Sequence, residues 1–163
     1  MSAGGVYTYF TSKDELVAAV AKQRHGLDMA AIESGADTSN AIDRVRAIAR
    51  AFFAELETPQ GRTRRRVAVM AWSEALLDPG IRASVLSGLD GPERALVAVV
   101  AQGQAEGVFK ANLDAHATAR AFIALFHGLV LQILWDSESN LEKQWAAFES
   151  YLQSLAATPI KSN

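Results

Sequence analysis

Hydroxyl and amino side chains that suit contact with phosphate lie close together at the start of the chain. Tyr7, Thr8, Tyr9 and Lys13 offer hydrogen-bond donors, and the N–H groups of a helix that begins at Ser12 would add to them. Small residues before Tyr7 would let a short helix enter a DNA groove. The candidate DNA-contact residues on these grounds are Ser2, Gly5, Tyr7, Thr8, Tyr9 and Lys13. The alternative is that the aromatic side chains form only a packing cluster, and we expect that role for Phe10.

The chain shows no residue pattern typical of an enzyme. It has no cysteine, which excludes a thiolate nucleophile, a thiolate metal site and a disulfide. His127 lies on an apolar helix, and His25 and His116 are too remote in sequence to form a ligand set with it. Paired acids, a Ser/His/Asp arrangement and a phosphate-binding glycine loop are also missing from the pattern. We therefore expect no catalytic residue, no metal and no cofactor.

Aromatic and polarizable side chains recur where expected helices would face one another, a common position for a small-molecule pocket. Trp72 is the strongest candidate because it lies off the apolar stripe of its helix, whereas the others could equally be ordinary core residues. The predicted ligand-binding residues are Phe52, Phe53, Met70, Trp72, Phe122, Phe126 and His127.

Composition limits the function classes further. The 163 residues are 50% hydrophobic and carry a formal net charge of −2, which argues against a chain devoted wholly to nucleic acid. The chain shows no basic segment followed by an apolar run near its start, and no uninterrupted apolar run of about 18 residues. We therefore expect a cytoplasmic protein without a membrane partner. The arginine run 62–66 is expected to form a solvated face or salt bridges rather than phosphate contacts.

Hydrophobic spacing predicts an all-α fold without strands or repeats. One helix is expected to bury Val67, Met70, Ala71, Ala75 and Leu76. A break is expected at Asp90-Gly91-Pro92, and a capping box from Ser139 to Glu142 is expected to start the last helix. The predicted helices cover about 13–34, 40–58, 62–77, 81–107 with its break, 114–136 and 139–155.

The last two helices carry more apolar surface than so short a chain can cover. Helix 114–136 is apolar on nearly all sides, and the last helix repeats apolar residues at intervals of four and three. Pairing with a second copy, with two helices from each subunit in a four-helix bundle, would cover both. The predicted homodimer interface contains Leu125, Leu129, Trp145, Phe148 and Leu152.

The opening segment resembles the end of the helix-turn-helix of the tetracycline-repressor (TetR) family of transcriptional regulators. The resemblance rests on Tyr7 and Phe10, spaced as Tyr-x-x-Phe, followed by Ser12-Lys13-Asp14-Glu15-Leu16 at a helix start. It implies a recognition helix from Ser2 to Tyr9 and roughly thirty to forty further residues before Met1, which would complete the helix-turn-helix. On this basis residues 1–34 are expected to be the remnant of a DNA-binding domain, and residues 35–163 a ligand-binding and dimerisation domain.

The resemblance implies a function as well as a TetR-like fold. A homodimer would bind a pseudo-palindromic operator as a ligand-responsive regulator, most simply a repressor, and a small apolar effector would release it. The alternative from another class is an all-helical ligand-binding or protein-interaction module without a DNA role. In that case Tyr7 and Lys13 would only pack or lie in solvent.

Overall fold

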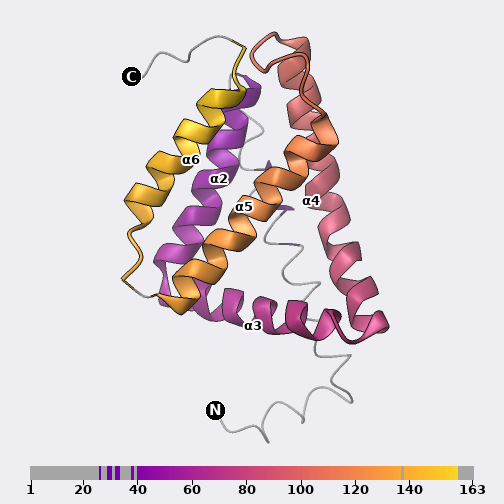
Figure 1. Cartoon of the computed structure of the whole chain (residues 1–163), viewed down its shortest axis with the longest axis vertical. Helices are drawn as coiled ribbons and strands as arrows, with labels where there is room; N and C mark the ends of the chain where they lie inside the picture. The colour runs from indigo at the N-terminus through magenta and orange to yellow at the C-terminus, as the bar shows by residue number, and fades with distance from the viewer. Residues whose placement is uncertain are drawn as a thin grey trace, which may run out of the picture.

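The computed structural model describes residues 40–136 and 138–157, together with Gly26, Met29, Ala30, Ile32, Glu33 and Thr38. Within these residues the chain forms five helices joined by short connections (Figure 1). They are α2 (Ala41–Glu57), α3 (Pro59–Ala75), α4 (Pro79–Ala105), α5 (Ala115–Trp135) and α6 (Leu141–Leu155). The prediction of an all-α fold is confirmed.

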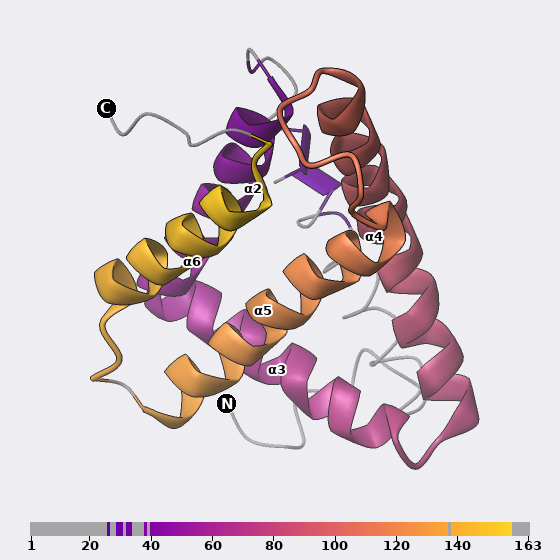
Figure 2. The same cartoon turned by 45° about the horizontal axis from the view of Figure 1, so that its top comes forward.

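Helix α2 is the central element, because it contacts each of the other four helices. Figures 1 and 2 show α6 beside α2, α3 crossing one end of the molecule and α4 rising from α3 along the opposite side. Helix α5 crosses between them and packs against α2, α3 and α4.

Polar caps start the helices close to the expected positions. Asn40 begins α2 by accepting a hydrogen bond from the Asp43 N–H at 3.0 Å, and Asp114 begins α5 by accepting one from the Ala117 N–H at 2.8 Å. The capping box expected from Ser139 is wrong by one residue, because Asn140 accepts from the Lys143 N–H instead. Ser139 Oγ accepts a hydrogen bond from Gln144 Nε2 at 2.6 Å.

Helix α4 runs without interruption through Asp90-Gly91-Pro92, so the predicted break is wrong. Its first half packs Ile81 against Ala71 and Ala75 of α3. Its second half joins the main core through Leu96, Val99 and Val100. Packing at both ends keeps the chain helical despite the proline, as tertiary contacts often override local propensity.

Helix α3 buries two of the five residues predicted for its inner face, Ala71 and Ala75, and exposes the three larger ones. Its buried residues are Gly61, Arg65, Ala68, Ala71 and Ala75, while Val67, Met70 and Leu76 are exposed. A Cβ added at Gly61 would lie 1.9 Å from the carbonyl oxygen of Glu55. The start of α3 thus approaches the end of α2 too closely for larger side chains, so small residues face inward.

Contacts between distant segments hold α6 in place. The Lys110 N–H donates to the Leu155 carbonyl at 3.0 Å, and the Ala157 N–H donates to the Val108 carbonyl at 2.9 Å. On the other side of α6, Arg46 of α2 forms an ion pair with Glu149 at 2.8 Å. Hydrogen bonding to Glu149 raises the pKa of Arg46 above its ordinary value.

Helix α5 is the most apolar helix described, and it is only partly covered. Its length and mean hydropathy of 1.6 would suit a membrane span by length and composition alone, properties that core helices of soluble proteins share. Only 28% of its most apolar window is buried. Helix α5 therefore has exposed apolar side chains, Leu125 and Trp135 among them.

Candidate functional site

A cavity of about 710 Å³ lies among α2, α4, α5 and α6, and Arg65 of α3 also contributes to its wall. This volume falls within the range of pockets that hold small organic molecules. Leu89, Pro92 and Leu96 supply the α4 side, so the buried proline within α4 forms part of the wall. The cavity is the candidate functional site.

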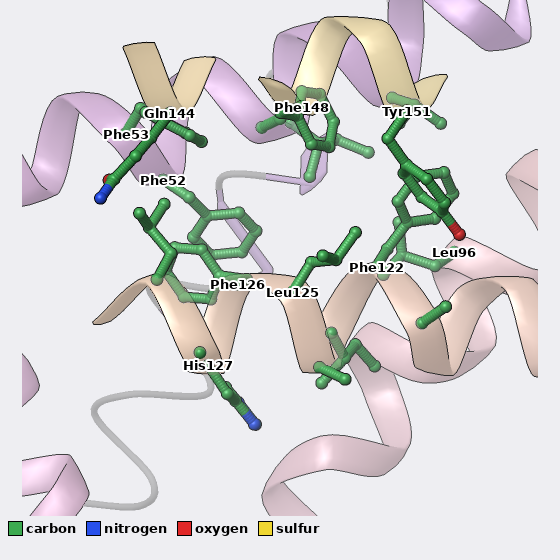
Figure 3. A pocket seen from close by; sticks show the side chains of 18 of the residues that line it. Phe52, Phe53, Leu96, Phe122, Leu125, Phe126, His127, Gln144, Phe148 and Tyr151 are labelled. Atoms are coloured by element: carbon green, nitrogen blue, oxygen red, sulfur yellow. The ribbon is translucent and has the colours of Figure 1, made fainter. Parts of the chain in front are cut away.

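Aromatic rings form much of the wall. Figure 3 shows Phe52, Phe122, Phe126 and Phe148 gathered in the space between α5 and α6. The centroids of Phe52 and Phe126 are 4.3 Å apart, and Phe122 contacts both Phe148 and Tyr151. Phe122 and Phe126 are one helical turn apart, so α5 presents both rings to the same cavity. Such a wall favours a ligand with an apolar body.

Arg65 is the only permanently charged side chain among the described residues of the wall, and it is 1% exposed. Its Nε and terminal nitrogen lie 2.9 and 2.7 Å from Oε2 of Glu55. Its Cζ lies 4.4 Å from the ring centroid of Phe126 and 5.4 Å from that of Phe52. Arg65 thus brings a paired cation to the edge of an apolar cavity.

Gln144 and His127 add polar groups to the wall. Gln144 Nε2 bonds to Ser139, whereas Gln144 Oε1 is buried and lacks a hydrogen-bond partner in the described part of the chain. The His127 side chain points away from the aromatic cluster in Figure 3, and its ring lies 4.3 Å from that of Trp72. A bound molecule that donates a hydrogen bond would satisfy Gln144.

The structure brings together five of the seven predicted ligand-binding residues: Phe52, Phe53, Phe122, Phe126 and His127 all contribute to the wall. Met70 does not, because its side chain is 63% exposed on the outer face of α3. Trp72 is not among the described lining residues, but its ring lies 4.3 Å from that of His127, which is. Whether any of these residues binds a ligand stays a prediction.

Arg65 is the residue that sequence reasoning missed, because it was treated as part of a solvated basic run. The expectation that this run forms salt bridges with nearby acids is confirmed, since Arg64 and Arg65 both pair with Glu55. The signal that could have revealed its burial is its spacing along α3 from the small residues that this helix buries. Arg65 lies four residues after Gly61 and three before Ala68, on the small-residue stripe that α3 buries.

The residues predicted for the dimer interface divide into three environments. Leu125, Leu129 and Phe148 contribute to the cavity wall. Trp145 packs within its own chain, with Arg50 Cζ 3.5 Å from its ring centroid and Phe53 at 5.2 Å. Leu152 is completely buried in the main core. Its side chain is not available to a second subunit, so we leave it out of the proposed interface.

The predicted DNA contacts Ser2, Gly5, Tyr7, Thr8, Tyr9 and Lys13 lie outside the described residues. Among the residues that are described, no group of three histidines or acids could hold a metal ion. The cavity wall likewise shows, in its described part, no nucleophile paired with a base.

Comparison with known proteins gives the same fold over nearly the whole chain. A TetR-family transcriptional regulator from Rhodococcus sp., described as putative, superposes with a TM-score of 0.77 and 19% identity, covering 95% of this chain and 81% of that one. A transcriptional regulator from Saccharomonospora viridis, also described as putative, was solved in complex with choline. It superposes with a TM-score of 0.75 and 20% identity, covering 96% of this chain and 81% of that one. The ketosteroid transcriptional regulator KstR2 of Mycobacterium tuberculosis superposes with a TM-score of 0.73 and 17% identity, covering 96% of this chain and 79% of that one.

Sequence comparison identifies the family directly. The family described as "BetI-type transcriptional repressor, C-terminal" matches residues 41–157, which include all five described helices. No curated protein sequence matches the chain. The resemblance noted from the opening segment is confirmed, and the expectation that the chain is not an enzyme agrees with a family of transcriptional regulators. The chain belongs to the TetR family of transcriptional regulators, with a C-terminal domain of the BetI type.

Proposed function

We propose that the protein is a ligand-responsive, DNA-binding transcriptional repressor that acts in the cytoplasm as a homodimer. A small, mostly apolar effector binds the cavity among α2, α4, α5 and α6 and releases the dimer from a pseudo-palindromic operator. The observation that carries this proposal is the aromatic-lined cavity of about 710 Å³ in a member of a regulator family. A binding site without catalytic groups in its described wall suits a sensor.

The position of the cavity supports a route from ligand to DNA. Its wall includes Arg65 of α3 and Leu89 and Pro92 of α4. The same two helices, α3 and α4, also share a small apolar cluster of Ala71, Ala75 and Ile81, which is separate from the main core. A ligand that fits better when this cluster is displaced would shift the protein toward that arrangement, and only such differential binding can change DNA affinity.

The uncovered surface of α5 supports the homodimer. Leu125 is 47% exposed and Trp135 is 78% exposed. A second copy, related by a two-fold axis, would cover the same face on both subunits and complete a bundle with α6. The proposed interface comprises Leu125, Leu129, Trp145 and Phe148. Because three of these also line the cavity, dimerisation and ligand binding would share one wall.

The DNA contact is proposed from the family and from the opening motif. Tyr7 and Lys13 would bind phosphate oxygens, and Ser2 and Gly5 would allow the recognition helix into the major groove. Thr8 and Tyr9 would add hydroxyl donors on the same short segment. The two helices of a dimer would then contact successive half-sites.

A mobility-shift assay tests this function. The natural gene product is mixed with duplex DNA from the region upstream of its own gene, with unrelated duplex of equal length as the control. We expect retention of the upstream duplex by a dimer, and release when a cavity ligand is added. If the protein binds cavity ligands but retains neither duplex at low salt, the all-helical binding module without a DNA role is the better description.

A further inference from the structure

Helix α6 brings two polar side chains to the cavity, one on each side of an apolar stretch. We propose that the cavity selects elongated molecules with an apolar body and a hydroxyl group at each end, one bound by Gln144 and the other by Tyr151. This inference rests on the proposed function, since it concerns the ligand of the same cavity.

The spacing of the two side chains sets the length of the ligand. Gln144 and Tyr151 both line the cavity and are two helical turns apart, which separates them by about 10.5 Å along α6. Ala147 and Phe148 line the cavity between them. Figure 3 shows Phe148 between the two polar side chains, and Phe148 contacts Phe122 of α5. A polar group in the middle of a ligand would lose water there without gaining a partner.

The Gln144 amide has one hydrogen-bonding atom without a partner. Its Nε2 donates to Ser139 Oγ at 2.6 Å, whereas its Oε1 is buried and has no hydrogen-bond partner in the described part of the chain. The last torsion of a glutamine side chain is broad, so the amide can turn toward the cavity that it lines. A hydroxyl group both donates and accepts, so it would pair with whichever atom of the amide it meets.

The Tyr151 hydroxyl supplies the second polar group. The Tyr151 ring packs edge-on against Phe122, with centroids 5.9 Å apart, which holds the side chain at the wall. Ser154 Oγ donates to the Tyr151 backbone carbonyl at 2.6 Å, but the phenolic hydroxyl forms no hydrogen bond to any of the residues that the structure describes. Because this hydroxyl both donates and accepts, a ligand hydroxyl is a suitable partner for it.

The remaining polar lining side chains lie toward the other end of the wall from Tyr151. His127 and Gln132 are in the C-terminal half of α5, which a short connection joins to the start of α6. Arg65 contacts the same half of α5, since its Cζ lies 4.4 Å from the ring centroid of Phe126. At its own end of the wall, Tyr151 is therefore the polar side chain among the described lining residues.

Three ligands with the same eight-carbon chain test the proposal. 1,8-Octanediol has a hydroxyl at each end, 1,2-octanediol has both at one end, and 1-octanol has one. Each is titrated into the protein by calorimetry. We expect 1,8-octanediol to bind about fivefold more tightly than its isomer, because it gains a hydrogen bond at the far end. A cavity with one polar end would give the reverse order, since the far hydroxyl of 1,8-octanediol would be buried without a partner.

Substitutions assign the two ends. Q144M and Y151F each remove one polar group and nearly preserve the size of the side chain. Each should weaken 1,8-octanediol binding about fivefold. Each should weaken 1-octanol binding by about twofold at most, because its single hydroxyl can turn to the polar group that remains. Q153M is the matched control, because Gln153 is exposed on the same helix and is not a described lining residue. Its affinities should remain those of the natural protein.

The outcomes separate this inference from the proposed function. Equal affinity for the two diols, tighter binding of 1,2-octanediol, or a preference for 1,8-octanediol that survives in both folded variants overturns the assigned ligand class and leaves the sensor function standing. Binding of none of the three ligands overturns both. Circular dichroism checks the fold of each variant. If Q144M is unfolded, Y151F decides the assignment, since it removes a hydroxyl that bonds to none of the described residues.

Discussion

Two alanines of α5 that are only two positions apart have opposite surroundings. Ala119 is completely buried in the main core, whereas Ala121 lines the cavity. Enlarging a side chain in a packed core usually costs about 1–3 kcal/mol, while filling open space costs little and can stabilise. These positions therefore test whether the cavity is open space or closely packed.

We expect A119L to lower the free energy of unfolding by about 1–3 kcal/mol and A121L to leave it nearly unchanged. Urea denaturation followed by circular dichroism measures both. Because the two substitutions add the same group to the same helix, differences in helix propensity cancel. An equal loss in both variants would mean that the space beside Ala121 cannot accept a ligand. A121L should also weaken the binding of a ligand to the cavity.

Single residues also show where sequence reasoning works and where it fails. The aromatic residues Phe52, Phe122 and Phe126 were predicted because large apolar side chains at helical spacing gather between helices. Arg65 was not, because its burial depends on Glu55, ten positions earlier on another helix. The local sign of its burial is its spacing from Gly61 and Ala68, and the charge of the arginine run outweighed that sign.

Among the elements, α4 depends on a close approach at its C-terminal end. A Cβ added at Gly103 would lie 2.3 Å from Phe109 Cδ2 and 2.9 Å from Ala41 Cβ. Phe109 is buried, and its neighbour Lys110 bonds to Leu155 at the end of α6. Gly103 therefore allows α4, the start of α2 and the 106–114 connection to meet.

G103A should destabilise the protein by about 1–3 kcal/mol, since Phe109 has no free space to move into. G128A is the matched control, because nothing lies within 4 Å of its added methyl group. At that helical position alanine should stabilise by about 0.5–1 kcal/mol. Thermal unfolding of both variants checks the pair, and a G103A variant as stable as G128A would contradict the close packing described.

At the level of helices, the sequence predicted where most elements lie but not which face of each is buried. Caps such as Asn40 and Asp114 are local signals, and they gave correct starts. The buried face of α3 depends on the approach of Gly61 to α2, and the continuity of α4 depends on packing at both of its ends. Neither contact is local. Apolar spacing alone favoured burial of the larger residues of α3, and the Gly91-Pro92 pair alone favoured a break in α4.

For the whole molecule, the exposed apolar face of α5 predicts self-association. Sedimentation equilibrium should show a dimer. L125E should shift the equilibrium at least tenfold toward monomer, since a buried unpaired charge at an interface costs several kcal/mol. L77E is the control, because Leu77 is 84% exposed at the turn between α3 and α4. A natural protein that stays monomeric, or equal dissociation in both variants, would argue against the proposed interface.

The proposed DNA-binding segment is also tested in the whole protein, with the natural gene product. K13A should weaken operator binding about equally for all sequences and reduce the dependence of affinity on salt, because a lysine–phosphate contact carries no base information. K110A is a suitable control, since Lys110 bonds to the Ser154 carbonyl far along the chain. Identical DNA affinities for the two variants would remove Lys13 from the proposed contact.

The central claim is that occupancy of the cavity and affinity for DNA are linked. The most direct measurement is the operator affinity of the natural gene product with and without saturating cavity ligand, together with the ligand affinity with and without operator. Linkage requires the two ratios to be equal. We expect ligand to weaken DNA binding, and DNA to weaken ligand binding, by the same factor of about five or more. A ligand that fills the cavity and leaves operator affinity unchanged would contradict the account.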